Sequence, residues 1–224
     1  VALFPHGIPN YRIDHQNSTF LANQFLRPKF KIATFGFCLP NKGFRELIEA
    51  TNLLKHRGID ISLDLFTAIY NDQYSFVFND LQNLITDLDL KSSVKIHGEY
   101  MPEQESLYKL SSANLIVFPY QFSNESSSAA VRHALAVNKP ILVTPLDVFK
   151  DIEDCLDYFS GFSAEIISKG LQEFIERKFY SEKYLDNFKH KRSRIIAERK
   201  FSILSDRLSS IISSLELNNN GELF

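Results

Sequence analysis

Two short polar segments carry residues that could bind a phosphate group. The first is Lys42-Gly43, where a β-branched and aromatic run gives way to a helical pattern. A lysine at a helix N-terminus supplies a positive charge, and a glycine beside it lets the backbone come close to a ligand. A surface lysine before a helix is also commonplace, and neither GxxxxGKS/T nor GxGxxG is present. Lys42 therefore needs a second phosphate-binding group beside it.

The second segment is 124–144, NESSSAAVRHALAVNKPILVT, which predicts a polar loop, a helix of roughly ten residues, a turn and a buried strand. Free backbone N–H groups and the helix dipole favour a phosphate at the start of such a helix. The hydroxyls of Ser126, Ser127 and Ser128 add donors, and the Glu125 carboxylate can accept hydrogen bonds from sugar hydroxyls. The same pattern also fits an N-capped surface helix without a ligand.

Composition narrows the class of protein. The chain has 224 residues, 44% of them hydrophobic, and a formal net charge of −2, so we expect one large or two small globular domains and no nucleic acid. No apolar run reaches the roughly 18 residues of a membrane span, and no signal peptide is visible. Cys38 and Cys155 lack metal-ligand spacing and are expected to be reduced thiols of a cytoplasmic protein. Because the chain opens at Val1, we expect a fragment of a longer protein.

The elements that must position these residues alternate along the chain. Apolar runs predict strands, and helical periodicity predicts the segments between them. The predicted strands are 1–4, 31–36, 61–67, 94–97, 115–119 and 141–143; the predicted helices are 44–56, 73–88, 103–111 and most of the chain from Glu165, and 9–29 is a predicted loop. This order favours an α/β fold, a Rossmann-like parallel sheet with helices on both faces and a helical C-terminal extension. Ligands of such sheets bind beyond the carboxyl ends of the strands, where Lys42 and Glu125 would form a two-sided diphosphate clamp.

Four segments, in this order and spacing, resemble a known family. FGFCLPNKGFRELIEA, VKIHGEY, LYKLSSANLIVFPY and NESSSAAVRHALAVNKPILVT are similar to the C-terminal, nucleotide-sugar-binding half of family 4 glycosyltransferases with the GT-B fold. The resemblance implies a donor-binding domain over 1–164. It also implies helices over 165–224 that pack on that domain and towards an N-terminal domain absent from this chain. The implied activity is metal-independent, retaining transfer from a nucleotide-diphosphate sugar to a glycan or lipid-linked acceptor, in bacterial surface polysaccharide synthesis.

The resemblance also assigns roles to single residues. Lys42, with Gly43, matches the family's diphosphate contact, and Gly36 matches the glycine that closes the first strand. Glu125 matches the first glutamate of a Glu-x7-Glu motif and is the expected catalytic residue at the donor sugar, and the amides near Ser127 and Ser128 match those that hold the phosphate. His97-Gly98 resembles the loop at the nucleotide base, although a simple turn fits these residues equally well.

Two positions depart from the family pattern. Phe37 stands where the family often has an arginine, and His133 replaces the second glutamate of the motif, which usually binds the ribose. A histidine can still hydrogen-bond a hydroxyl, and Arg132 could partly replace the missing charge. These departures favour the alternative of a catalytically degraded domain that binds or scaffolds a partner. A GT-B sugar epimerase is a further alternative that rests on shared fold alone.

The remaining expectations concern partners and location. No His, Cys, Asp or Glu cluster has metal spacing, so we expect no metal or other cofactor besides the nucleotide-sugar substrate. The basic run between Arg177 and Lys200, which includes Arg192, fits a solvated helix face. It also fits peripheral contact with the anionic inner face of the membrane.

Overall fold

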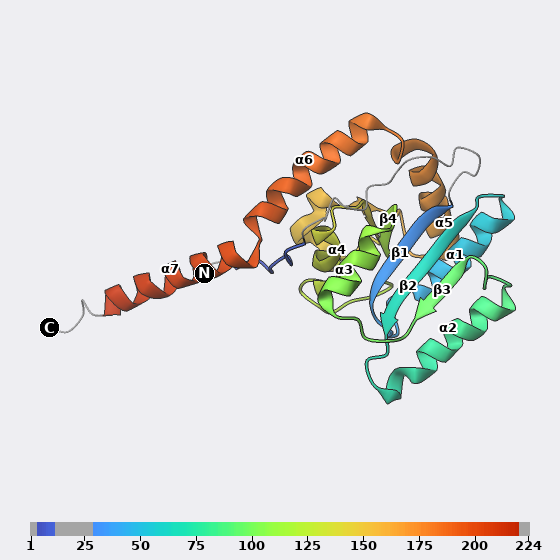
Figure 1. The fold of residues 1–224 in the computed structure, drawn as a ribbon, viewed down its shortest axis with the longest axis horizontal. Helices are drawn as coiled ribbons and strands as arrows, with labels where there is room; N and C mark the ends of the chain where they lie inside the picture. The colour runs from blue at the N-terminus through green and yellow to red at the C-terminus, as the bar shows by residue number, and fades with distance from the viewer. Residues whose placement is uncertain (1–3, 12–28, 220–224) are drawn as a thin grey trace.

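The computed structural model describes residues 4–11 and 29–219. Within these residues six strands form one parallel sheet in the order β3-β2-β1-β4-β5-β6 (Figure 1). The strands are β1 (Phe30–Phe37), β2 (Ile61–Ala68), β3 (Val94–His97), β4 (Leu115–Phe118), β5 (Ile141–Val143) and β6 (Asp157–Tyr158). The chain thus builds outward from β1 in one direction and then, from β4, in the other. The predicted Rossmann-like parallel sheet is confirmed.

The central strand β4 shows why both faces of the sheet are covered. All of its residues are buried. Leu115 and Val117 belong to one apolar cluster, whereas Ile116 and Phe118 belong to another. Successive side chains of a strand point to opposite faces, so a strand that is apolar throughout needs packed helices on each side.

Helices supply these two covers. The first cluster includes side chains from α1 (Phe44–His56), α2 (Ser75–Asp87) and α5 (Ala164–Glu173). The second includes side chains from α3 (Glu103–Ser111), α4 (Ala129–Ala136) and the 3-10 helical segment η3 (Asp147–Cys155). Figure 1 shows α1 and α2 on one side of the sheet, with α3 and α4 on the other. The prediction of helices on both faces is therefore confirmed.

The C-terminal part is helical, as expected. A π-helical segment (Phe174–Lys178) leads into α6 (Glu182–Glu198), and α7 (Phe201–Asn219) then extends away from the sheet (Figure 1). Arg192 of the basic run is not solvated: it is fully buried and donates a hydrogen bond to the Lys139 carbonyl. The side chains of α5 share a core with α1, and a contact of 165–224 with a further domain stays a prediction.

Other expectations met different outcomes. Phe4 is not in a strand, and 1–3 of the predicted strand 1–4 lie outside the described residues, as does most of the predicted loop 9–29. Ile8 instead donates its N–H to the Arg199 carbonyl at 2.8 Å, beside α6. The strand β6 and the segment η3 were not predicted. Among the described residues, no helix combines the length and the apolar character needed to cross a membrane.

Candidate functional site

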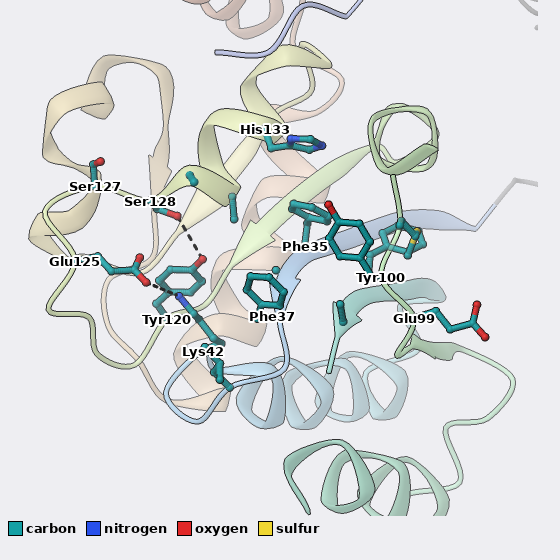
Figure 2. Close-up of a pocket in the computed structure, with 17 residues that line it drawn as sticks. Phe35, Phe37, Lys42, Glu99, Tyr100, Tyr120, Glu125, Ser127, Ser128 and His133 are labelled. Carbon is teal, nitrogen blue, oxygen red and sulfur yellow. Dashed lines mark hydrogen bonds and ion pairs between the residues drawn. The ribbon is translucent and has the colours of Figure 1, made fainter. Parts of the chain in front are cut away.

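A cavity of about 360 Å³ opens at the carboxyl ends of β1 and β4. These neighbouring strands mark the point where the strand order reverses, which is where open parallel sheets bind their ligands. The lining residues come from strand ends, the loops that follow them and the first turns of α4 (Figure 2). They are Phe35, Gly36, Phe37, Leu39, Lys42, Phe66, Ala68, Glu99, Tyr100, Met101, Tyr120, Glu125, Ser127, Ser128, Ala129, Ala130 and His133.

The loop between β1 and α1 places Lys42 at one end of this cavity. Lys42 Nζ lies 3.5 Å from Glu125 Oε1 and 4.0 Å from the centre of the Tyr120 ring. Its side chain is only 13% exposed, so the position of the ammonium group is restricted by the surrounding side chains. The two residues proposed for the diphosphate clamp therefore meet across the cavity, and each partly neutralises the other when no ligand is present.

Gly43 explains how two loops come this close together. Its φ of 74° is left-handed, and a Cβ added to it would lie 1.7 Å from the Pro119 carbonyl oxygen. In addition, the Gln121 N–H donates to the Asn41 carbonyl at 2.8 Å. Gly43 does not line the cavity; its role is to let the lysine loop pack directly on the end of β4.

The start of α4 forms the neighbouring wall. Ser128 is the N-cap of this helix, and its Oγ accepts a hydrogen bond from the Val131 N–H at 3.4 Å. Ser127, Ala129 and Ala130 also line the cavity. The first turn of an α-helix has backbone N–H groups without helical partners and a positive dipole end, so this wall favours an anion.

His133 lies at the far end of the cavity from Lys42 (Figure 2). Its ring stacks on Phe35 at 4.8 Å, and its Nε2 lies 2.7 Å from Ser106 Oγ. Burial lowers the pKa of His133, against a smaller opposing effect of Glu103. Because the Ser106 hydroxyl donates its proton to the Glu103 carbonyl at 2.8 Å, Nε2 must be the protonated nitrogen. A neutral His133 then keeps Nδ1 as an acceptor for a ligand hydroxyl.

The lining of the cavity contains few charged side chains. Among the lining residues that the structure describes, Lys42 is the sole lysine or arginine, and Glu99 and Glu125 are the carboxylates. Tyr120 is fully buried below Lys42, and burial raises the pKa of its hydroxyl, which therefore stays protonated. A negatively charged group is favoured only where Lys42 and the start of α4 converge.

Arg132, which was expected to supply charge at the donor, does not line the cavity. The side chain is buried, donates to the Ser128 carbonyl at 2.7 Å and pairs with Asp151, which Arg199 also binds. Neighbouring helix positions point about 100° apart. With His133 facing the cavity, Arg132 therefore points away from it, and its partner Asp151 belongs to η3.

Three other expected donor-binding residues also lie outside the lining. His97 Nε2 is 3.1 Å from Asp64 Oδ1, and its ring stacks on Phe66. Gly98 lies against the Phe78 ring, where an added Cβ would come within 2.6 Å. Ser126 is exposed and is not among the lining residues. The residues that follow Gly98 line the cavity instead, among them Tyr100.

The aromatic lining was not predicted as part of the site. Phe35, Tyr100 and Tyr120 line the cavity, and Phe37 projects into it although the sequence marked it only as a departure from the family pattern. Their positions at or just after the strand ends were the available signal. No group of three or more His, Cys, Asp or Glu side chains within 4–11 and 29–219 could hold a metal ion.

Comparison with solved structures identifies the fold. No protein-family model matches the chain, and no curated protein matches it in sequence. A sucrose-phosphate synthase from Thermosynechococcus elongatus superposes with a TM-score of 0.74 at 15% identity, over 97% of this chain and 53% of that one. A glycosyltransferase from Rickettsia africae superposes with a TM-score of 0.69 at 15% identity, over 83% of this chain and 48% of that one.

A third similar structure contains ligands. HepE from Anabaena, in complex with UDP and glucose, superposes with a TM-score of 0.69 at 14% identity, over 83% of this chain and 48% of that one. The chain therefore spans about half the length of these structures. At such identities the likeness concerns the fold, which is that of one Rossmann-like half of a GT-B glycosyltransferase.

Proposed function

We propose that this chain is the donor-binding domain of a glycosyltransferase that uses a nucleotide-diphosphate sugar. The observation that carries the proposal is the convergence of Lys42, Glu125, the start of α4 and His133 on one cavity at the β1–β4 switch point. The fold likeness to HepE in complex with UDP and glucose supports the same ligand class.

The charges suggest how the site would act on the donor. When the bond from sugar to diphosphate breaks, negative charge grows on the diphosphate, and Lys42 with the free N–H groups of α4 would stabilise it. The Glu125 carboxylate would accept hydrogen bonds from hydroxyls of the donor sugar and so orient the sugar ring. His133, at the other end, would accept a hydrogen bond from the ribose through Nδ1. No resident metal or cofactor is invoked.

Binding would replace an existing contact. The Lys42 ammonium group now pairs with the Glu125 carboxylate at 3.5 Å. A diphosphate is the more highly charged partner, so it would draw Lys42 toward itself and release Glu125 for the sugar hydroxyls. The ion pair thus holds both groups in place before the donor arrives.

The finer features of the proposal rest on the sequence resemblance to family 4. They are retention of configuration, a glycan or lipid-linked acceptor, a role in bacterial surface polysaccharide synthesis, and a cytoplasmic location with peripheral contact to the inner membrane face. The acceptor would also need an N-terminal GT-B domain, since the chain spans about half of the similar structures.

Thermal unfolding tests the proposal. Ligands that bind the native state raise its stability by mass action, so UDP-glucose or GDP-mannose should raise the midpoint temperature of unfolding. Uridine and guanosine, which lack the diphosphate, should have little effect at the same concentration. Equal shifts for nucleosides and nucleotide sugars would contradict the diphosphate site.

The second candidate function is a catalytically degraded domain that binds a partner. Phe37 favours it, because this exposed ring stands in the cavity where the resembling family often has a cation. The two candidates separate in the full-length protein. Nucleotide binding without sugar transfer to any acceptor of a glycan and lipid-linked panel would favour the degraded domain, whereas measurable transfer would exclude it.

A further inference from the structure

Exposed aromatic side chains follow neighbouring strands at the mouth of the cavity. Phe37 is the last residue of β1 and pairs in register with Ala68, the last residue of β2. The Phe37 ring packs edge-on against Tyr70 at 5.1 Å, and Tyr70 packs against Tyr74 at 6.3 Å. We call these three rings the aromatic row.

The aromatic row leads out of the cavity. Phe37 lines the cavity and Tyr70 does not, although their rings touch. Phe37 is 42% exposed and Tyr70 is 57% exposed, and Tyr100 on the adjoining loop is 77% exposed. Clustered aromatic exposure of this kind marks a binding surface. Rings with two side-chain torsions also lose little entropy on binding.

Hydrogen bonds fix the backbone beneath these rings. The Cys38 N–H donates to the Ala68 carbonyl at 2.8 Å, and the Ile69 N–H donates to the Gly98 carbonyl at 3.1 Å. The loops after β1, β2 and β3 are therefore tied side by side. The backbone that carries Phe37 and Tyr70 is thus fixed before any ligand arrives, which lowers the entropy lost on binding.

The charge around the row limits what it can bind. Segments 68–76 and 98–100 contain two carboxylates, Asp72 and Glu99, and no lysine or arginine. A phosphate would be repelled here and attracted to Lys42 instead. A plain hydrocarbon chain would cover the tyrosine hydroxyls without giving them a partner. A neutral sugar ring fits this surface. It carries no charge that the carboxylates would repel, its C–H faces can pack on the rings, and its hydroxyl groups can pair with the tyrosine hydroxyls.

We propose that the aromatic row binds a neutral sugar ring of the acceptor glycan at the mouth of the donor cavity. The proposal rests on the function proposed above, which places the donor between Lys42 and His133. A ring stacked on Phe37 and Tyr70 would lie beside that donor. Phe37 is then a specificity-determining residue, and its presence is no longer an argument for a catalytically degraded domain.

Saturation-transfer NMR on the whole chain tests the row. The probes are methyl glycosides of β-D-glucose, β-D-galactose and α-D-mannose, each measured with and without UDP. At least one glycoside should receive saturation from the protein. Tyr70→Ala should reduce the affinity by about tenfold or more, and Tyr70→Trp should retain it.

Tyr180→Ala is the matched control. Tyr180 is also exposed and also packs edge-on against a phenylalanine, Phe179, at 5.0 Å, but it precedes α6 and is not among the lining residues of the cavity. This variant should bind the glycoside as the unaltered chain does. UDP-induced stabilisation, recorded for every variant, should be unchanged by Tyr70→Ala because Tyr70 does not line the cavity.

The outcomes separate the two proposals. Loss of glycoside binding in Tyr70→Ala alone, with UDP binding kept, supports the acceptor row. No saturation transfer to any glycoside while UDP still binds overturns the row and leaves the donor site standing. Tyr70-dependent binding of uridine or of an isoprenoid alcohol, in place of a glycoside, also overturns it. Glycoside binding in a chain that UDP does not stabilise retains the sugar surface and refutes the donor site.

Discussion

At the scale of residues, Lys42 contributes the positive charge of the cavity. Lys42→Ala should weaken UDP binding by about 10- to 100-fold, since hydrogen bonds to charged groups contribute about 1.5–3 kcal/mol. Uridine binding should change little, because the lost contact is with phosphate. Isothermal titration of both ligands measures the difference.

Lys55→Ala is the control for Lys42. Lys55 lies near the other end of α1 and pairs with Asp89 at 3.5 Å, the same separation as in the Lys42–Glu125 pair. Removing it should leave UDP affinity unchanged. Equal losses for UDP and uridine in Lys42→Ala, or equal losses in both variants, would show that Lys42 does not contact the diphosphate.

His133 should make folding sensitive to mild acid. Burial lowers its pKa in the folded chain below the ordinary value of 6.5, so the unfolded chain binds the proton more tightly. The free energy of unfolding should therefore fall as the pH drops through 6.5 and level off below the folded pKa. His133→Gln removes the titrating imidazole, so the loss of unfolding free energy at low pH should be smaller in this variant.

Urea unfolding at about pH 7.5 and about pH 5 measures this fall. The fall should be smaller in His133→Gln, and His133→Phe, which lacks the proton and keeps the stacking on Phe35, should behave in the same way. An identical fall in all three proteins would show that His133 is not the titrating group.

The sequence was informative about residues where local spacing decides their position. Lys42 and Glu125 each follow a predicted strand within a few residues, and the carboxyl ends of parallel strands share one edge, so both could be placed at that edge. Arg132 and His97 could not be placed in this way. The side that each faces depends on a rotation of one residue and on partners far along the chain, Asp151 and Asp64.

At the scale of elements, the approach of two loops depends on Gly43. In Gly43→Ala the new Cβ would be strained by a left-handed φ and would also clash with the Pro119 carbonyl oxygen. In Gly58→Ala the φ of 76° is left-handed too, but the space around the Cβ is open. A left-handed residue costs about 1–2 kcal/mol, which is the loss expected for Gly58→Ala. Gly43→Ala should lose more than about 4 kcal/mol because the backbone must also move.

Chemical denaturation of the two glycine variants compares these losses directly. The difference between them isolates the contact of the lysine loop with the end of β4 from the strain of the φ angle. Similar losses for Gly43→Ala and Gly58→Ala would mean that the two loops can separate without cost, and that Lys42 is not positioned by this contact.

The N-cap of α4 gives a second paired experiment. Ser128 and Ser163 cap α4 and α5, and each Oγ accepts from the N–H three residues later at 3.4 Å. Alanine at either position should cost about 1 kcal/mol of stability. Only Ser128→Ala should also weaken UDP binding in isothermal titration, because Ser128 lines the cavity. Equal affinities would place the phosphate away from α4.

Most elements could be predicted because their patterns are local. The apolar strand β5 agrees with its predicted bounds, and α3 agrees over Glu103–Ser111. The strand β6 contains only Asp157 and Tyr158, whose types do not indicate a strand. It forms because Leu142 and Val143 of β5 present a free edge to it, which is a contact that no local pattern contains.

At the scale of the whole molecule, the site depends on strand order. Alternating strands and helices predicted a parallel sheet, but not that β4 would pair with β1. That pairing creates the switch point and brings the lysine loop against the serine loop. The burial of Arg192, which lies in α6, could not be predicted from the sequence either. The carbonyl that it binds belongs to Lys139, 53 residues earlier.

The central claim is that a nucleoside diphosphate binds where Lys42 and the start of α4 converge. The most direct measurement is a titration of the ¹⁵N-labelled chain with UDP, GDP and ADP, followed by the backbone amide chemical shifts. At least one of the three nucleotides should shift the amides of Lys42 and of 127–130 together with that of His133. Shifts confined to amides elsewhere, or no shifts with any of the three nucleotides, would contradict the central claim.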